Sequence, residues 1–172
     1  MNYINLRTND FKIEITKEEP ISVWIDPKFQ METENLENKS KTTSFELILC
    51  YSQIKLDNIV SKISFSPDNV SEIPTFVKEI NLKLNEYILN QKKYTDRIVD
   101  EILKLKNRSW LSSEENKYTK KEIMLKFGEI KEIYFNKDFS YSIFYNDNQL
   151  FLGHYIEVRI KKEKITEITL AG

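Results

Sequence analysis

The stretch FSYSIFYNDNQLFLGHYIEVRI, residues Phe139–Ile160, contains two segments in which large apolar or aromatic residues alternate with smaller or polar ones. A period of two is typical of strands that bury one face. We therefore expect an antiparallel hairpin of the strands Phe139–Tyr145 and His154–Ile160, with Tyr145 opposite His154. Apart from His154, one face then carries only apolar or aromatic side chains: Phe139, Tyr141, Ile143, Tyr145, Ile156, Val158 and Ile160.

This pattern fixes the faces of the hairpin, because a slip of one residue would turn the whole apolar set to water. The opposite face carries Ser140, Ser142, Phe144, Tyr155, Glu157 and Arg159. A third strand follows if Lys161–Ile165 contains a turn, since Ile168 and Leu170 then join the apolar face. The C-terminal region is therefore expected to form a β-meander.

The loop Asn146–Gly153 and its surroundings contain the candidate site residues. His154 is the only histidine of the chain, and Asp147 is close enough in sequence to accept a hydrogen bond from its ring. One interpretation is that these two residues hold the hairpin end while Phe151 fills the edge of the core. The other is an acid/base pair in a cleft between helices and sheet. The candidate binding residues are Tyr145, Asp147, Phe151 and His154; no catalytic residue and no metal ligand is assigned.

The first third of the chain also favours strands. Alternation or short apolar runs predict strands at Phe11–Lys17, Ile21–Asp26, Ser44–Tyr51 and Asn58–Ser66, although Ser44–Tyr51 also fits a short buried helix. The polar segment 27–43 is expected to be an exposed loop, and its acidic part METENLEN, residues 31–38, is a candidate for contact with a partner.

The middle of the chain has helical periodicity. Apolar residues at spacings of three and four run from Ile73 to Leu105, with Ser71 as the expected N-cap and Pro74 in the first turn. Either one long helix or two helices that meet near Asn90–Lys93 fit this stripe. We expect the break, because helices beyond about 30 residues are unusual in small domains. The charged run Lys92–Arg108 is expected on a solvated face.

A short second helix is predicted by a capping box. The Thr119 hydroxyl and the Glu122 carboxylate stand three positions apart, so each can bond the backbone N–H of the other. This helix is expected to end at Gly128, as the residue best suited to a left-handed conformation.

Strands, then helices, then a meander indicate an α+β fold in which two or three helices pack on one face of an antiparallel sheet. We expect one domain over residues 1–172, with strands mainly in 1–70, helices in 71–128 and the β-meander in 129–172. Strands thus lie at both ends of the chain.

Composition excludes several classes of protein. Basic and acidic residues nearly balance, 26 against 27, which argues against a nucleic-acid binder. The single cysteine, Cys50, excludes an intramolecular disulfide and is expected to be a buried hydrophobe. With three glycines and no phosphate-binding motif, no cofactor is expected. No signal segment or membrane span is evident, so we expect a soluble cytoplasmic protein.

The C-terminal segment resembles a bacterial family known as domain of unknown function 2262. Members read as an aromatic residue, acidic residues, Phe-Trp-Gly-His, an alternating strand and a terminal glycine. The matching residues here are Tyr145, Asp147, Leu150, Phe151, Gly153, His154, Ile156, Val158 and Gly172. Asn146 and Asn148 stand where acids are common in the family and Leu152 replaces the usual Trp, which weakens a metal or acid/base role. The resemblance covers about the last two-thirds of the chain and implies a fold and a bacterial origin, but no reaction.

These observations favour a small bacterial binding protein without catalytic activity, for example an immunity protein that neutralises a toxin by occluding its active site. One alternative is an enzyme that uses His154 with Asp147 for acid/base chemistry. Another is a structural subunit that pairs through a strand edge. The sequence leaves the oligomeric state open.

Overall fold

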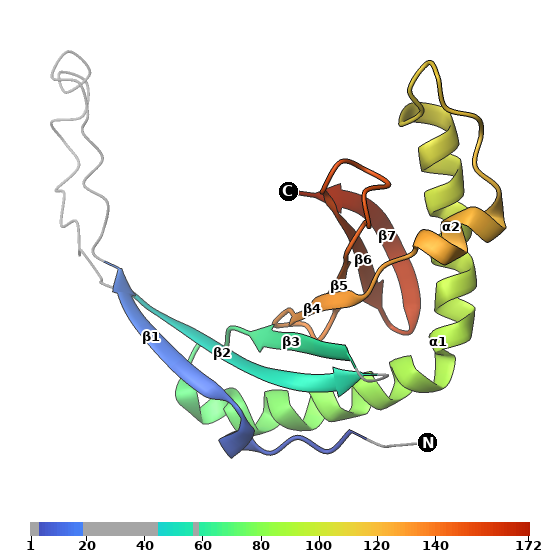
Figure 1. The fold of residues 1–172 in the computed structure, drawn as a ribbon. Helices are drawn as coiled ribbons and strands as arrows, with labels where there is room; N and C mark the ends of the chain where they lie inside the picture. The colour runs from blue at the N-terminus through green and yellow to red at the C-terminus, as the bar shows by residue number, and fades with distance from the viewer. Residues whose placement is uncertain (1–3, 19–44, 57–58) are drawn as a thin grey trace, which may run out of the picture.

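The computed structural model describes residues 4–18, 45–56 and 59–172, which form a seven-stranded sheet with a long helix on one face (Figure 1). The strands are β1 Lys12–Glu18, β2 Phe45–Leu56, β3 Ile59–Phe65, β4 Ile130–Phe135, β5 Tyr141–Tyr145, β6 Tyr155–Lys161 and β7 Lys164–Ala171. The helices are α1 Ile73–Ser109 and α2 Lys120–Lys126, with 3-10 turns η1 Thr8–Asp10 and η3 Val70–Glu72. The α+β class, the strands at both ends and the C-terminal meander are confirmed. The strand expected at 21–26 and the loop 27–43 lie outside the described residues.

The strands follow one another across the sheet in chain order, from β1 at one edge to β7 at the other. All neighbours are antiparallel except β3 and β4, which are parallel. The expectation of an antiparallel sheet is therefore wrong for this one pair. Parallel neighbours cannot be joined by a tight turn and need a crossover along the sheet. The segment that contains α1 and α2 forms this crossover.

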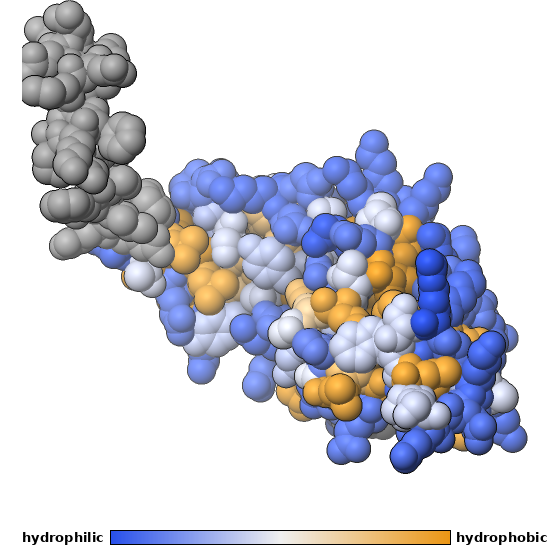
Figure 2. Space-filling view, turned by 90° about the horizontal axis from the view of Figure 1, so that it is seen from above, coloured by the Kyte–Doolittle hydropathy of each residue, from blue (hydrophilic) through white to orange (hydrophobic). Residues whose placement is uncertain are grey.

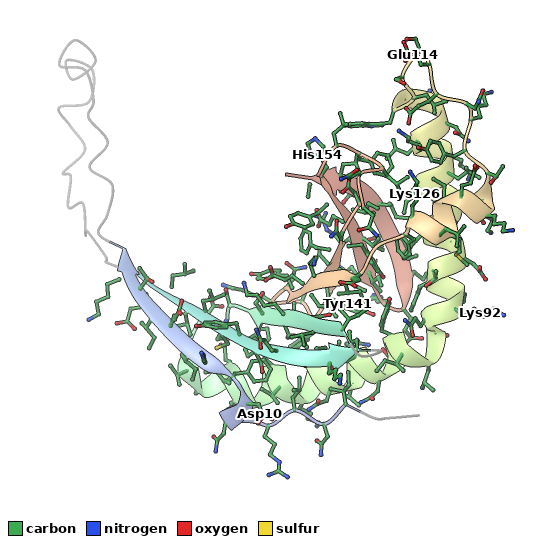
Figure 3. The ribbon with its side chains drawn as sticks, in the orientation of Figure 1. Asp10, Lys92, Glu114, Lys126, Tyr141 and His154 are labelled. Atoms are coloured by element: carbon green, nitrogen blue, oxygen red, sulfur yellow. The ribbon has the colours of Figure 1, made fainter. Side chains whose placement is uncertain are left out.

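Helix α1 is one continuous helix of 37 residues, so the expected break near Asn90–Lys93 is wrong. The described residues contain one long helix and one short helix, whereas two or three helices were expected to pack on one face of the sheet. Instead of breaking, α1 bends: its first half runs beneath β1–β3 and its second half stands beside β6 and β7 (Figure 1). Lys92 lies just after this bend (Figure 3).

A side-chain hydrogen bond of the kind that accompanies helix bending lies next to the bend, although Asn85 makes the same bond to the Asn81 carbonyl oxygen earlier in α1. The side-chain amide of Asn90 donates a hydrogen bond to the Glu86 carbonyl oxygen, 2.9 Å away, one turn earlier in α1. A side chain that competes for a carbonyl of the helical ladder is an established source of bending. Proline and glycine, the other common causes, are absent from the middle of α1. The two halves of the helix can therefore follow the curled sheet.

The helix ends differ from the sequence expectation in two details. Glu72 rather than Ser71 is the N-cap of α1, although Pro74 does lie in the first turn. The Thr119–Glu122 capping box of α2 is present as expected. Gly128, however, is not left-handed, since positive φ angles among the glycines occur at Gly153 and Gly172.

Gly128 is instead required by a close approach of two chain segments. A Cβ at this position would lie 1.9 Å from the backbone oxygen of Asn146. The same approach brings the Asn146 N–H to 2.9 Å from the carbonyl oxygen of Glu129, where it donates a hydrogen bond. The connection from α2 into β4 can therefore pass the end of β5 only with a glycine at residue 128.

The C-terminal hairpin has the predicted faces but not the predicted register. Tyr145 pairs with Ile156, Ile143 with Val158 and Tyr141 with Ile160, a shift of two residues from the expected partners. A shift of two preserves the faces, so the same apolar row is buried. The third strand follows as predicted, with Ile168 opposite Val158 and Leu170 opposite Ile156.

The shift has a cause at each end of the hairpin. Phe139 has a φ of 57° and lies in the turn before β5, where the Asn136 N–H donates to the Ser140 carbonyl oxygen at 2.8 Å. His154 lies before β6, within a connection of nine residues that has its own hydrogen bonds. Neither residue belongs to a strand, and alternation alone could not reveal this.

The sheet buries one face against α1 and leaves the other uncovered in the described part of the chain. Cys50 is fully buried on the helix side, as expected, and burial raises the pKa of its thiol. On the uncovered face Leu47, Val60 and Tyr155 are 46%, 60% and 46% exposed. The view from above shows hydrophobic patches bordered by hydrophilic side chains (Figure 2).

Among the described residues, no helix combines the length and apolar character needed to cross a membrane.

The substitution Gly128→Ala should destabilise the protein strongly, because the added methyl group meets backbone that is held by a hydrogen bond. Overpacking of this kind costs about 3 kcal/mol. Gly153→Ala is the matched control: its Cβ would meet nothing within 4 Å, so it costs only the strain of a positive φ, about 1 kcal/mol. Urea denaturation measures both free energies of unfolding. A Gly128→Ala protein as stable as wild type would contradict the close approach.

Candidate binding site

The four candidate residues named from the sequence separate into two places. Tyr145 points from β5 toward α1, where its hydroxyl lies 2.7 Å from that of Tyr87. Asp147, Phe151 and His154 belong to the connection between β5 and β6.

Asp147 organises the β5–β6 connection. Its side chain is buried, and one carboxylate oxygen accepts from the backbone N–H groups of Phe151 at 2.7 Å and Gly153 at 3.0 Å. The other oxygen accepts from the N–H of Gln149 at 3.1 Å. Several residues here have positive φ angles, namely Asn148, Gln149, Leu152 and Gly153. The hydrogen bonds to Asp147 thus offset the energetic cost of these positive φ angles, because a carboxylate that accepts from several N–H groups forms strong hydrogen bonds.

His154 does not share a hydrogen bond with Asp147 among the residues that the structure describes. Its half-buried ring lies edge-on to Trp110, with ring centroids 5.6 Å apart. Phe151 is fully buried, fills the edge of the core and meets the same indole at 5.6 Å. The acid/base pair is therefore not assembled in this structure, and the loop end is held by Asp147 and aromatic packing.

A buried lysine fixes Trp110, and sequence reasoning missed it. Lys106 is only 5% exposed, and its Nζ donates to the Trp110 carbonyl oxygen at 2.8 Å and lies 3.4 Å from the Glu115 carboxylate. The backbone N–H of Ser112, followed by Tyr118 and Lys106, lowers the pKa of Glu115. Lys106 lies in the charged run expected to be solvated. The signal in the sequence is its spacing, since Lys106 continues the buried row of Ile98 and Ile102 at intervals of four residues.

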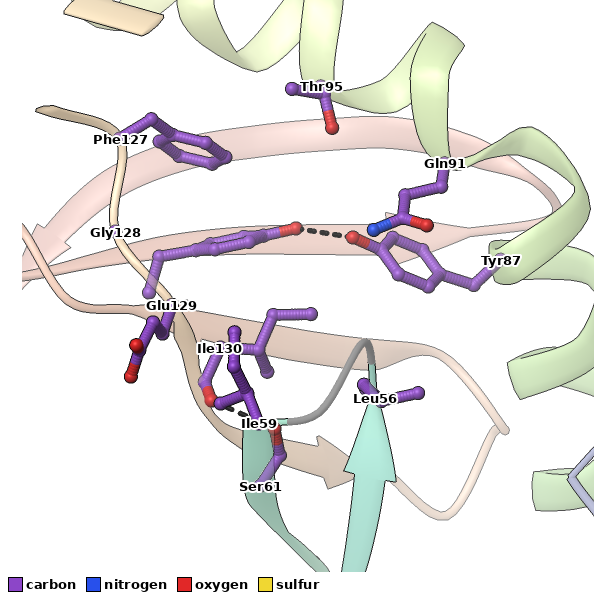
Figure 4. Close-up of a pocket in the computed structure, with 11 residues that line it drawn as sticks. Leu56, Ile59, Ser61, Tyr87, Gln91, Thr95, Phe127, Gly128, Glu129 and Ile130 are labelled. Carbon is purple, nitrogen blue, oxygen red and sulfur yellow. Dashed lines mark hydrogen bonds between the residues drawn. The ribbon is translucent and has the colours of Figure 1, made fainter. Parts of the chain in front are cut away.

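A pocket of about 220 Å³ lies beside the Tyr87–Tyr145 hydroxyl pair (Figure 4). Three parts of the fold meet there: the bend of α1, the ends of β2 and β3, and the connection from α2 into β4. The walls are largely apolar and include Leu56, Ile59, Phe127 and Ile130. Thr95 and Glu129 add polar groups. The Phe127 ring packs on Tyr145 with centroids 4.7 Å apart, which holds one wall in place.

The phenol of Tyr145 beside this pocket is held in its neutral form. Burial, reinforced by the neighbouring Tyr87, raises the pKa of Tyr145 well above its ordinary value. The phenol therefore stays protonated at neutral pH and cannot act as a base there. Within the described residues, no group of three or more His, Cys, Asp or Glu side chains is placed to hold a metal ion.

The substitution Asp147→Asn should destabilise the protein by about 2 kcal/mol, because an amide cannot accept all three backbone hydrogen bonds with equal strength. His154→Ala should cost less, about 1 kcal/mol, since it loses only the edge contact with Trp110. Chemical denaturation of both proteins measures the difference. If His154→Ala were the more damaging change, the histidine rather than the aspartate would organise the loop.

Tyr145→Phe should lower the free energy of unfolding by about 1 kcal/mol at pH 7, because the bond to Tyr87 is lost. In wild type the free energy of unfolding also depends on pH through Tyr145, because the pKa of this residue in the folded protein lies above the unfolded value near 10.0. The unfolded chain releases this proton first as pH rises, so wild-type stability should fall above pH 10 more steeply than that of the variant. Tyr155→Phe, at an exposed site, is the control. Parallel pH profiles for wild type and Tyr145→Phe would be inconsistent with a buried neutral phenol.

Comparison with known proteins places the chain in a family. A family model described as "Uncharacterized protein conserved in bacteria (DUF2262)" matches residues 36–170. Neither a curated protein nor a solved structure gives a match. The match covers most of the chain and confirms the family, while the Phe-x-Gly-His pattern of the C-terminal hairpin stays a prediction. The chain therefore belongs to this bacterial family.

Proposed function

We propose that this chain is a non-catalytic binding protein, and that the pocket beside Tyr145 receives an anchoring side chain of a protein partner. The observation that carries the proposal is the pocket itself: an apolar recess with polar groups, built at the junction of three parts of the fold. A protein interface commonly depends on a few anchors that enter such desolvated recesses.

The size of the pocket favours a side chain over a larger molecule. Its volume is about 220 Å³, below the roughly 300–1,000 Å³ of sites for drug-sized ligands. Apolar walls formed by Ile59, Phe127 and Ile130 suit an aliphatic or aromatic anchor. Thr95 and Glu129 can bond a polar tip of that anchor, so tyrosine-like groups are favoured.

The surroundings of the pocket support binding in a second way. Its walls are held by the Gly128 approach to Asn146 and by the packing of Phe127 on Tyr145. A recess that is formed before the partner arrives saves the entropy cost of ordering it on binding. Glu129 is exposed beside it, 3.9 Å from Lys131 Nζ, and can accept a hydrogen bond from a basic or polar group at the rim of a partner.

A more specific form of the proposal is an immunity protein that neutralises a toxin by occluding its active site. Its support is the acidic segment 31–38, which lies outside the described residues, together with Glu129 beside the pocket. Carboxylates on both would attract a basic toxin surface and increase the rate of association.

The test is co-expression with a toxin-like protein encoded next to this chain. Wild type should restore growth, whereas Thr95→Trp, which places a bulky ring in the pocket, should not. Leu125→Trp is the control, because Leu125 is 77% exposed on α2 and does not line the pocket. Binding of the purified proteins should weaken at least about tenfold for Thr95→Trp, or about 1.4 kcal/mol.

The possible failures are distinguishable. If wild type neither binds the neighbour nor restores growth, the toxin-neutralising form is wrong. If Thr95→Trp binds as well as wild type, the partner does not use the pocket. Circular dichroism of Thr95→Trp shows whether the variant is folded before either conclusion is drawn.

A further inference from the structure

A groove of about 660 Å³ runs between the second half of α1 and the edge of the sheet. The α1 side carries Arg97, Glu101, Lys104, Leu105 and Arg108, which recur at spacings of three and four and so lie on one helix face. The other side is the segment 165–168 of β7. This groove is separate from the pocket beside Tyr145.

The sheet side of the groove includes the backbone edge of β7. Side chains alternate between the two faces of a strand, so a groove on one face alone would be lined by every second residue. Here four consecutive residues, 165–168, line it. β7 is the last strand of the sheet, and no described strand pairs with its outer edge. Such an edge presents unpaired N–H and C=O groups to an incoming strand.

Two arginines that form no ion pair among the described residues dominate the charge of the groove. Glu101 is paired with Lys104 at 2.8 Å, and Glu167 is paired with Arg159 at 2.6 Å. Arg97 and Arg108 are exposed and form no ion pair among the described residues. They stand eleven positions apart on α1, which places them about 16 Å apart along the helix axis.

We propose that this groove binds an extended acidic peptide segment of a partner, which adds to β7 as a further strand. Two acidic residues four positions apart in that segment span about 13 Å, and the long arginine side chains cover the remaining distance. Residues at these positions and the one midway between them point to the same face. The middle residue is apolar and meets Leu105 and Ile168.

An acidic peptide suits this groove better than a second copy of the chain. Two copies that paired through their β7 edges would bring together two sets of Arg97, Lys104 and Arg108 in a symmetric interface. Like charges placed opposite one another oppose association. A peptide with two carboxylates neutralises both arginines and leaves the edge hydrogen bonds to β7 intact.

The test uses fluorescence anisotropy with a labelled peptide of sequence Ser-Glu-Thr-Leu-Thr-Glu-Ser. Wild type should bind it, and binding should weaken as salt is raised. Arg97→Glu and Arg108→Glu should each weaken binding about tenfold or more. Lys92→Glu is the matched control: it makes the same charge change on the same helix, and Lys92 does not line the groove (Figure 3). It should change the affinity less than about twofold.

A second peptide tests the added strand. Replacement of both threonines by proline removes backbone N–H donors and should abolish binding. The proposal is overturned if wild type does not bind the first peptide, if the proline peptide binds equally well, or if Lys92→Glu weakens binding as much as Arg97→Glu. It is also overturned if light scattering shows a wild-type dimer that excess peptide dissociates, because β7 would then pair with a second copy.

Discussion

The parallel pairing of β3 with β4 is the constraint on which the rest of the structure depends. All neighbours in the sheet are consecutive strands of the chain, and every other pair is antiparallel. At β3 and β4 the chain must return along the sheet, and α1 with α2 makes that return. With 37 residues α1 is about 55 Å long, more than twice the length of a seven-residue strand. It can therefore cover β1–β3 first and the C-terminal meander afterwards (Figure 1).

The pocket forms at the boundary between the two parts of the sheet, β1–β3 and the C-terminal meander. Ser61 of β3 donates to the Ile130 carbonyl oxygen at 2.9 Å, and Ser64 donates to the Glu132 carboxylate at 2.6 Å, so polar side chains reinforce the parallel pair. The bend of α1 faces this junction with Tyr87, whose hydroxyl meets that of Tyr145. A binding recess at the junction of separately built halves is a common arrangement in proteins.

Local features of the fold could be predicted from the sequence, whereas features that depend on distant contacts could not. The Thr119 capping box and the apolar face of the C-terminal meander follow from short-range patterns, and both are present. The continuity of α1 could not be predicted, since it depends on a curled sheet that supports both halves. The role of Gly128 depends on the backbone of Asn146, which no local pattern reveals. For the site, the sequence named Tyr145, Asp147, Phe151 and His154 together, but it could not show that Tyr145 faces Tyr87 on α1 while the Asp147 carboxylate accepts from backbone N–H groups of its own loop.

Native-state hydrogen exchange, followed amide by amide, tests most directly whether α1 joins the two halves of the sheet into one unit. Backbone amides on both sides of the bend, at Tyr87 and Ile98, should be protected as strongly as those of Ile63 in β3 and Ile133 in β4. All four residues are buried at or near the junction. Fast, independent exchange over residues 90–93 would show that α1 is two helices in solution and would contradict the account.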